Sequence, residues 1–456
     1  MKNKKLDLLK QNWQEAKILI LGFAREGQDS FKFLRRLFPD KILAIADQND
    51  KIISSNSRIT QKIIKDKNIK LHLGKNYLQS LKEYDIVIKS PGIPPKIINS
   101  YFRNGQKITS QTEIFFENCP GIIIGITGTK GKSTTSSLIY NILKEGYKKA
   151  HLVGNIGKPV LNLLFSATKN DIYVYELSCH QLYNLKISPH IAVFLNIYPE
   201  HLDYYKNFEE YIAAKANITL HQKETDYLIY NTKNEIVNSI AKKSKAKKIP
   251  LYNYSQIIKK VGINKNPLIG KFNQLNIAAA IKVGEIFGLK SNLIKKGVET
   301  FKPLKHRLEF VGEFNKIKFF NDSLSTIPQS AIAAIESFGK DVETIILGGF
   351  DRGIDFKELA DAINKSKIKN IVFFPPSGER IWQEIKKKSS KRYKILFTDD
   401  MKEAVIFAIE NTSPGKICLL SNASPSFGIF KDYKERGNLF KYYLKKYQCK
   451  KSNQIF

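Results

Sequence analysis

The chain has 456 residues, a length at which roughly three domains of ordinary size are expected. It has no run of the roughly 18 apolar residues that a membrane span requires, and its charged N-terminus lacks the apolar core of a signal peptide. The net charge of +33 comes from lysines spread along the whole chain, with no basic arm and no RNA-binding signature, which disfavours a dedicated nucleic-acid surface. The four cysteines form no CxxC pair. We therefore expect a soluble, cytoplasmic protein.

Three segments each begin with an apolar strand that leads into a glycine-containing turn, which is typical of nucleotide-binding α/β units. The strands are predicted over residues 17–21, 121–126 and 344–347, the first two being followed by helices over 28–37 and to about residue 144. Three later apolar runs, IVFF, KILF and KICLL, predict further strands of the third segment. Strands that alternate with helices imply parallel sheets. We predict an α/β protein with domains over residues 1–110, 111–303 and 304–456.

The turn after the first strand, GFAREG, is a glycine-poor relative of the GxGxxG nucleotide-binding loop. Ala24 takes the place of the middle glycine, and Asp47 follows a second predicted strand. This match is weak evidence by itself, because dehydrogenases share it.

The second segment carries TGTKGKST at residues 127–134, between a hydrophobic strand and a helix, which is the context that a phosphate-binding loop requires. Its glycines let backbone amides turn toward phosphate oxygens, the helix N-terminus adds partial positive charge, and Lys132 would reach the terminal phosphates. The strict GxxxxGK[ST] spacing is not met, because Ile126 stands five residues before Gly131. An incidental glycine-rich turn is the alternative to an ATP site.

TGTxGKST is the form that this loop takes in Mur ligases and in the related folylpolyglutamate synthases, and the chain resembles this family along essentially its whole length. The further matching motifs are VGNIG (153–157), YELSCHQL (175–182), NIYPEHLDYY (196–205), AAKANI (213–218), GKFNQLNIAAAI (270–281), KHRLEFV (305–311) and NDS (321–323). The resemblance implies a Rossmann-like N-terminal domain, a central P-loop-type ATPase domain and a Rossmann-like C-terminal domain. It also implies an ATP site made of Gly128, Thr129, Lys130, Gly131, Lys132, Ser133, Thr134, Asn273, Asn276, Arg307 and Asp322.

The same resemblance implies two magnesium ions, one held by Ser133 and Glu176 and the other by His201 and Lys215. Glu176 ends an apolar run at the carboxyl edge of a predicted strand, where open α/β sheets bind their ligands. Lys215 matches a lysine that family members carry as a carbamate, an oxygen-donor anion that suits magnesium. A lone histidine or lysine is more often an ordinary surface residue, so these assignments depend on the motifs. With Lys132, the three residues Glu176, His201 and Lys215 are the expected catalytic set.

Two N-terminal motifs, VIKSPGIPP (87–95) and SQTEIFF (110–116), resemble the uridine-nucleotide domain of the glutamate-adding branch of the family. The implied UDP-sugar site consists of Arg25, Glu26, Asp47 and Gly92, with Asn155 toward the muramoyl end. In the third segment, GGFDRGIDF (348–356) and residues 419–440 resemble the same branch. A dicarboxylate amino acid needs cations and hydrogen-bond donors, and the implied glutamate site consists of Thr326, Arg352, Ser426 and the backbone of Tyr433.

One motif of the third segment departs from this branch. The chain reads NDSLSTIP where the branch usually reads NDSKATN, so Leu324 replaces a lysine and Pro328 is added. A related branch that adds L-glutamate has a similar sequence at this motif. The stereochemistry of the glutamate therefore stays open.

The implied activity is the ATP-dependent addition of glutamate, D-glutamate on the better match, to UDP-N-acetylmuramoyl-L-alanine in peptidoglycan precursor synthesis. The substrate carboxylate would become an acyl phosphate that the glutamate amine attacks, and domain closure would bring the two sites together. We expect a monomer that acts on small molecules, with no nucleic-acid or membrane partner. The alternatives are the L-glutamate branch, another Mur or folylpolyglutamate-type ligase, or a basic protein that binds ATP only as a structural ligand.

Overall fold

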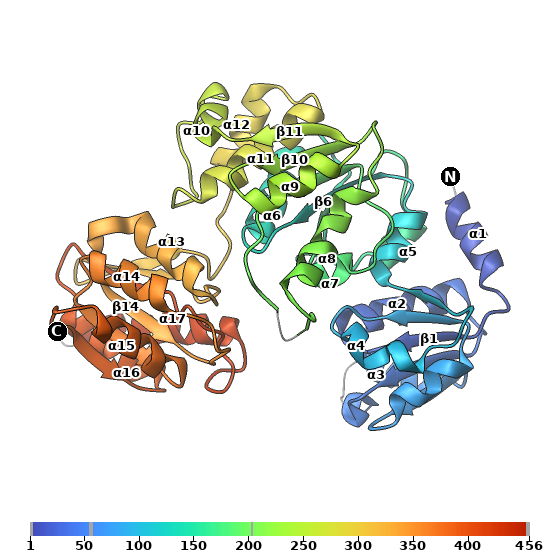
Figure 1. Ribbon diagram of the computed structural model, residues 1–456, viewed down its shortest axis with the longest axis horizontal. Coiled ribbons are helices and arrows are strands. Elements are labelled where there is room, and N and C mark those ends of the chain that lie inside the picture. The colour runs from blue at the N-terminus through green and yellow to red at the C-terminus, as the bar shows by residue number, and fades with distance from the viewer. Residues whose placement is uncertain (1–2, 54–57, 202–203, 453–456) are drawn as a thin grey trace. The chain divides into compact units, whose positions relative to one another are not determined.

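The computed structural model describes residues 3–53, 58–201 and 204–452, so two residues of the 196–205 motif, Leu202 and Asp203, lie outside the described residues. The chain forms two compact units, Met1–Asn264 with Leu275–Thr300, and Lys265–Gln274 with Phe301–Phe456. Three sheets flanked by helices confirm the predicted α/β fold class (Figure 1). The domain boundaries near residues 110 and 303 stay predictions.

The N-terminal sheet of the first unit is parallel throughout, with strand order β3-β2-β1-β4-β5. Its strands are β1 (Ile18–Leu21), β2 (Leu43–Asp47), β3 (Ile69–Leu73), β4 (Ile86–Lys89) and β5 (Lys107–Thr109). Its helices are α1 (Lys4–Asn12), α2 (Arg25–Leu37), α3 (Arg58–Lys65) and α4 (Pro95–Ile98), with the 3-10 turns η1 (Asp50–Ile53), η2 (Tyr77–Glu83) and η3 (Asn99–Tyr101). Strand β1 is central and fully buried, which explains its continuous apolar run. Helix α2 begins at Arg25, earlier than the predicted residue 28, and Glu26 in its first turn suits the positive end of the helix dipole.

The second sheet of this unit is also parallel, with order β11-β10-β9-β6-β8-β7. Its strands are β6 (Ile122–Thr127), β7 (Ala150–Gly154), β8 (Ile172–Glu176), β9 (Ile191–Phe194), β10 (Tyr227–Asn231) and β11 (Lys247–Leu251). Its helices are α5 (Gln111–Asn118), α6 (Lys132–Leu143), α7 (Cys179–Leu182), α8 (Phe208–Leu220), α9 (Glu235–Lys243), α10 (Tyr254–Lys260), α11 (Asn273–Ile286) and α12 (Ser291–Glu299), with the 3-10 turn η4 (Leu161–Phe165). Strand β6 lies between β8 and β9, so the loops that follow these three strands meet at one edge of the sheet.

The two sheets of the first unit share a continuous core. Phe115 of α5 lies edge-on to the ring of Tyr173 in β8 at 5.0 Å, and Phe33 of α2 packs on Phe165 at 5.4 Å. The buried Asp29 of α2 accepts hydrogen bonds from the side chains of Gln111 (2.9 Å) and Asn162 (3.0 Å). These contacts fix α2, which follows β1, against α5 and η4 of the second sheet.

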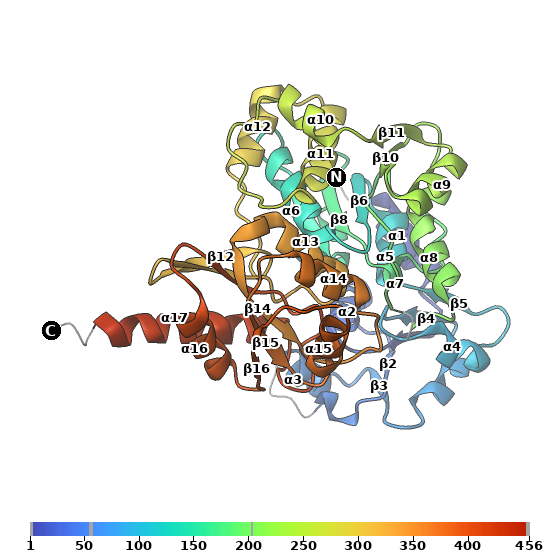
Figure 2. The same ribbon diagram turned by 60° about the vertical axis from the view of Figure 1, so that its left-hand side comes forward.

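The second unit has one six-stranded sheet, with order β12-β13-β17-β14-β15-β16. Its strands are β12 (Glu309–Phe314), β13 (Ile317–Asn321), β14 (Val342–Gly348), β15 (Asn370–Phe374), β16 (Lys394–Phe397) and β17 (Ile417–Leu420). Its helices are α13 (Pro328–Phe338), α14 (Lys357–Lys365), α15 (Ser377–Lys387), α16 (Met401–Asn411) and α17 (Tyr433–Ser452), with the 3-10 turn η5 (Gly339–Asp341). Helix α17 extends outward from this unit in Figure 2.

The edge pair β12 and β13 departs from the expected parallel arrangement, because it is an antiparallel hairpin. Asn315 and Lys316 connect the strands with φ angles of 52° and 62°. Two central residues with positive φ form the tight turn whose twist matches that of the flanking strands. No helix in the described part of the chain combines the length and apolar character needed to cross a bilayer.

Candidate active site

The phosphate loop joins β6 to α6. Gly131 has φ +88°, and a Cβ at this position would lie 2.5 Å from Oδ1 of Asn276, so only glycine fits. Asn276 also accepts a hydrogen bond from the Thr135 hydroxyl at 3.0 Å, which ties α11 to the start of α6. The Lys132 ammonium donates to the carbonyls of Gly128 (2.8 Å) and Thr129 (3.0 Å). The loop therefore combines a helix N-terminus, inward-turning backbone and a positioned cation.

Beside this loop lies a cavity of about 260 Å³, which we call the reaction cavity. It is lined by Glu26, Pro91, Gly92, Lys132, Asn155, Ser178, Cys179, His180, Gln181, Glu200, His201, Tyr211 and Lys215. Three of the four predicted catalytic residues, Lys132, His201 and Lys215, thus line one cavity. Near it, Glu176 ends β8 and accepts a hydrogen bond from Asn155 Nδ2 at 2.9 Å.

Glu176 is the residue best suited to a cation. It is 1% exposed, and its Oε2 is a buried oxygen that has no hydrogen-bond partner among the residues that the structure describes. A buried carboxylate oxygen without a partner is costly unless a ligand or ion satisfies it. Within the described residues, no three His, Cys, Asp or Glu side chains cluster as a metal site. The donor set fits magnesium, which usually takes one or two carboxylates and completes its shell with water and substrate phosphates.

Lys215 lies on α8 and is 1% exposed. Its ammonium donates to the Gly128 carbonyl at 3.0 Å and lies 5.0 Å from the centre of the Tyr211 ring. Burial, together with the nearby charge of Lys132, lowers the pKa of Lys215 to about 7. A large fraction of this amine is therefore neutral at physiological pH, which is the form that reacts with carbon dioxide to give a carbamate.

Glu200 and His201 lie in the segment after β9, and both line the reaction cavity. Glu200 forms an ion pair of 3.0 Å with Lys130. Although burial disfavours its charged form, the positive charges of Lys130, Lys132 and His201 outweigh this and lower the pKa of Glu200 to about 2. His201 has φ +60°, an uncommon conformation for a residue with a side chain, and its ring lies 4.8 Å from that of His180.

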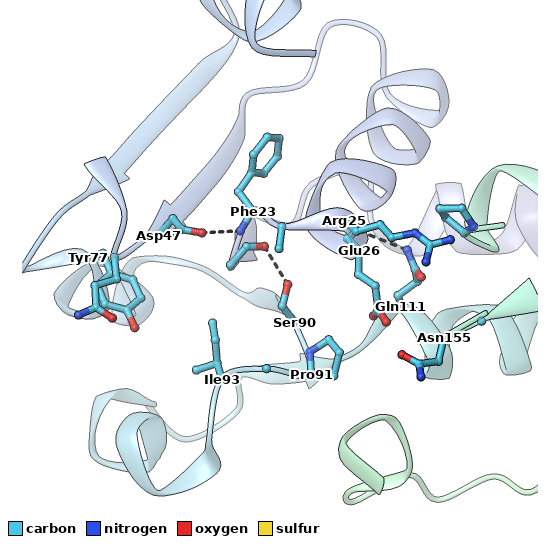
Figure 3. Close-up of a pocket in the computed structure, with 16 residues that line it drawn as sticks. Phe23, Arg25, Glu26, Asp47, Tyr77, Ser90, Pro91, Ile93, Gln111 and Asn155 are labelled. Carbon is cyan, nitrogen blue, oxygen red and sulfur yellow. Dashed lines mark hydrogen bonds between the residues drawn. The ribbon is translucent and has the colours of Figure 1, made fainter. Parts of the chain in front are cut away.

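A second cavity, of about 410 Å³, lies at the carboxyl ends of β1, β2 and β4, and we call it the nucleotide cavity (Figure 3). The predicted residues Arg25, Glu26, Asp47, Gly92 and Asn155 are all among its lining residues. Asp47 accepts a hydrogen bond from the Phe23 amide at 2.6 Å, which fixes the turn after β1, and Asn155 lies at the far end (Figure 3). The weak GFAREG signal therefore marks a cavity that holds every residue predicted for this site.

The nucleotide cavity and the reaction cavity share four lining residues, Glu26, Pro91, Gly92 and Asn155. At this junction Glu26 accepts a hydrogen bond from Gln181 Nε2 at 2.8 Å. Burial raises the pKa of Glu26 to about 7. Arg25 donates to the Gly157 carbonyl, so the first two residues of α2 contact α7 and the segment after β7.

The remaining predicted residues lie in the second unit. Asp322 is buried and accepts hydrogen bonds from the Leu308 amide (3.1 Å) and the Ser421 hydroxyl (2.9 Å). Burial raises the pKa of Asp322 to about 6, and Arg307 partly opposes this shift. Asn273 donates to the Ile269 carbonyl at 2.6 Å. The predicted ATP residues thus fall in both units, with Asn276 in the first and Asn273, Arg307 and Asp322 in the second.

The segments predicted to bind glutamate meet at the carboxyl ends of β13, β17 and β14. Phe350 N–H donates to the Pro425 carbonyl at 2.9 Å, which joins the loop of Arg352 to that of Ser426. The Ser323 hydroxyl donates to the Tyr433 carbonyl at 2.8 Å. Ser426 is buried, Thr326 and Tyr433 are partly buried, and Arg352 is exposed.

Sequence reasoning missed Arg436, which is 0% exposed. Its guanidinium donates to the Ser323 hydroxyl (3.0 Å), the Ser323 carbonyl (2.8 Å) and the Ser424 carbonyl (3.1 Å). One side chain of α17 therefore holds the loops after β13 and β17 together. The signal was an arginine inside KERGNLF, where a charge on an otherwise buried helix face requires partners.

We expect Arg436→Met to destabilise the protein by about 3 kcal/mol, because two buried carbonyls lose their donors. The measurement is the Tm of the full-length protein, with Arg392→Met, a change at an exposed arginine of the same unit, as the matched control. An unchanged Tm for Arg436→Met would contradict this role.

Comparisons with known proteins agree with this geometry. The family model of the Mur ligase middle domain matches residues 126–265, and that of the Mur ligase glutamate ligase domain matches residues 306–423. A UDP-N-acetylmuramoylalanine--D-glutamate ligase of Acetivibrio thermocellus is 34% identical over 467 residues, covering 96% of this chain and 98% of the relative. The ligase of the same name from Clostridium tetani is 34% identical, with coverages of 96% and 98%.

Solved structures show the same fold. The MurF ligase of Thermotoga maritima in complex with ADP has a TM-score of 0.59 at 17% identity and covers 95% of this chain and 96% of its own. MurF from Acinetobacter baumannii has a TM-score of 0.61 at 15% identity, with coverages of 97% and 98%. The chain belongs to the Mur ligase family.

Proposed function

We propose that this protein is an ATP-dependent ligase that joins glutamate to UDP-N-acetylmuramoyl-L-alanine. The observation that carries the proposal is the junction between the two cavities, at which Glu26, Pro91, Gly92 and Asn155 line both. A nucleotide-sugar bound with its uridine end near Asp47 would pass this junction, and its terminal carboxylate would lie beside Lys132. The names of the nearly full-length relatives support the same substrate and favour D-glutamate as the amine.

The chemistry proposed for the reaction cavity is transfer of the ATP γ-phosphoryl group to the substrate carboxylate. Two anions must approach each other, so positive charge is needed where they meet. Lys132 supplies a fixed cation at the phosphate loop, and the Glu176 carboxylate with the Ser133 hydroxyl would hold magnesium. Bound magnesium would neutralise charge on the phosphate and carboxylate oxygens. His201 and a carbamate on Lys215 are proposed for a second ion.

The second step is attack of the glutamate amine on the acyl carbon, which releases phosphate. The proposed glutamate site of Thr326, Arg352, Ser426 and the Tyr433 backbone belongs to the second unit, whereas the phosphate loop belongs to the first. The reaction therefore requires the two units to close over the substrates, with Arg307 and Asp322 proposed to reach ATP from the second unit. Closure would also exclude water from the acyl phosphate.

The test is release of phosphate by the purified protein with ATP, magnesium and UDP-N-acetylmuramoyl-L-alanine, with either D-glutamate or L-glutamate. We expect release with D-glutamate, and a product that gains one glutamate residue. Release with L-glutamate alone would assign the protein to the L-glutamate-adding branch, which the NDSLSTIP motif resembles. If neither isomer gave release above the amine-free control, the proposal would be wrong.

A further inference from the structure

Tyr204 connects two parts of the candidate active site that are distant in sequence. Its hydroxyl lies 2.8 Å from the Pro91 carbonyl and 3.0 Å from the Ile93 carbonyl, both in the turn after β4. Pro91 lines both cavities and Ile93 lines the nucleotide cavity. Tyr204 therefore holds a wall of the nucleotide cavity from the side of the second sheet.

The other end of Tyr204 contacts the reaction cavity. Its backbone N–H donates to the His201 carbonyl at 3.0 Å. Its ring lies 4.2 Å from that of His180, and the His180 ring lies 4.8 Å from that of His201. Because His201 has φ +60°, an uncommon conformation for a residue with a side chain, it needs such contacts to keep that conformation.

The Tyr204 hydroxyl is suited to this connection. The side chain is buried, and burial raises its pKa, so the hydroxyl stays protonated and can donate. The Ile93 carbonyl also accepts a hydrogen bond from the Lys89 ammonium at 2.9 Å. Loss of the tyrosine hydroxyl would therefore affect the Pro91 carbonyl most, at the junction of the two cavities.

We propose that Tyr204 is a positioning residue that couples occupation of the nucleotide cavity to the arrangement of the reaction cavity. The inference rests on the proposed function, because it assumes that a nucleotide-sugar fills the first cavity and ATP approaches the second. A nucleotide-sugar that contacts Pro91 and Ile93 would fix the position of Tyr204, and with it the conformation of His201. Binding of one substrate would then tighten binding of the other, and such coupling is reciprocal.

The experiment measures the Kd of a non-hydrolysable ATP analogue with magnesium, with and without saturating UDP-N-acetylmuramoyl-L-alanine. In the wild-type protein we expect the nucleotide-sugar to tighten analogue binding about fivefold or more. In Tyr204→Phe the ratio of the analogue Kd without the nucleotide-sugar to the Kd with it should fall to within about twofold of one. The Kd of the analogue alone should be unchanged. Tyr183 belongs to the same aromatic cluster, because the Tyr205 ring lies 6.1 Å from that of Tyr183 and 4.9 Å from that of Tyr204. The matched control is Tyr183→Phe, which removes a hydroxyl that donates to Glu210 at 3.0 Å and should keep the wild-type ratio.

Tyr204→Phe with the wild-type ratio would overturn the proposal, as would a wild-type ratio of one. A fall of this Kd ratio toward one in Tyr183→Phe as well would also overturn it, because the effect would then belong to the cluster as a whole. A parallel turnover assay separates the two hypotheses. A wild-type protein without turnover contradicts the proposed function, whereas turnover with an unchanged ratio contradicts only the role of Tyr204.

Discussion

Replacing Lys132 with alanine should lower the ligase turnover about 100- to 1,000-fold, which is the size of effect seen when a group that stabilises transition-state charge is removed. The Lys132 ammonium is held at the phosphate loop by the carbonyls of Gly128 and Thr129. It lies at the start of α6, next to Gly131, whose positive φ turns the loop inward. The charge that develops during phosphoryl transfer would have no fixed cation at this position in the variant.

The measurement is the rate of phosphate release with all three substrates, together with the KM for ATP. The control is Lys144→Ala, the same change at an exposed lysine directly after the last residue of α6, which should leave turnover unchanged. Turnover of Lys132→Ala within about tenfold of wild type would show that the loop binds ATP without taking part in the transfer.

The parts of this site that are local in sequence could be predicted from it. The strand, loop and helix around TGTKGKST follow one another directly, so apolar periodicity and glycine spacing were sufficient to locate β6 and α6. The β12–β13 hairpin was equally local, because only two residues separate two strands of alternating apolar residues, and the sequence could have predicted it.

The contacts that join the two cavities could not be predicted in this way. Gln181 and Glu26 are 155 positions apart, and Tyr204 and Pro91 are 113 apart. No periodicity records which distant loops pack together, because that depends on how the two sheets of the first unit share their core. Family resemblance supplied Glu26 and Asn155 as substrate residues, whereas Gln181 and Tyr204 emerged only from the structure.

The proposed functional role of Lys215 and the cost of burying its charge can both be measured with one variant. Lys215→Met should lower turnover about 100-fold or more, because it removes the amine that would become a ligand of the second ion. The same change should raise the stability of the protein below pH 7, by about 1–3 kcal/mol, because a buried charged group is replaced by an apolar one of similar length. Its hydrogen bond to the Gly128 carbonyl and its cation–π contact with the Tyr211 ring offset part of this cost in the wild type.

The shift in the pKa of Lys215 determines whether the stability of the protein rises or falls with pH. The pKa of Lys215 is about 7 in the folded protein against 10.5 in a model peptide, so between these values the unfolded chain binds more protons than the folded one. Wild-type stability should therefore rise with pH through this window, and the advantage of Lys215→Met should shrink from its full value below pH 7 toward zero near pH 10.5. The measurement is Tm against pH in carbon dioxide-free buffer, with exposed Lys223→Met as the control. A gain in Tm that does not change with pH would mean that the pKa of Lys215 is the same in the folded and unfolded protein, and that packing alone explains the gain.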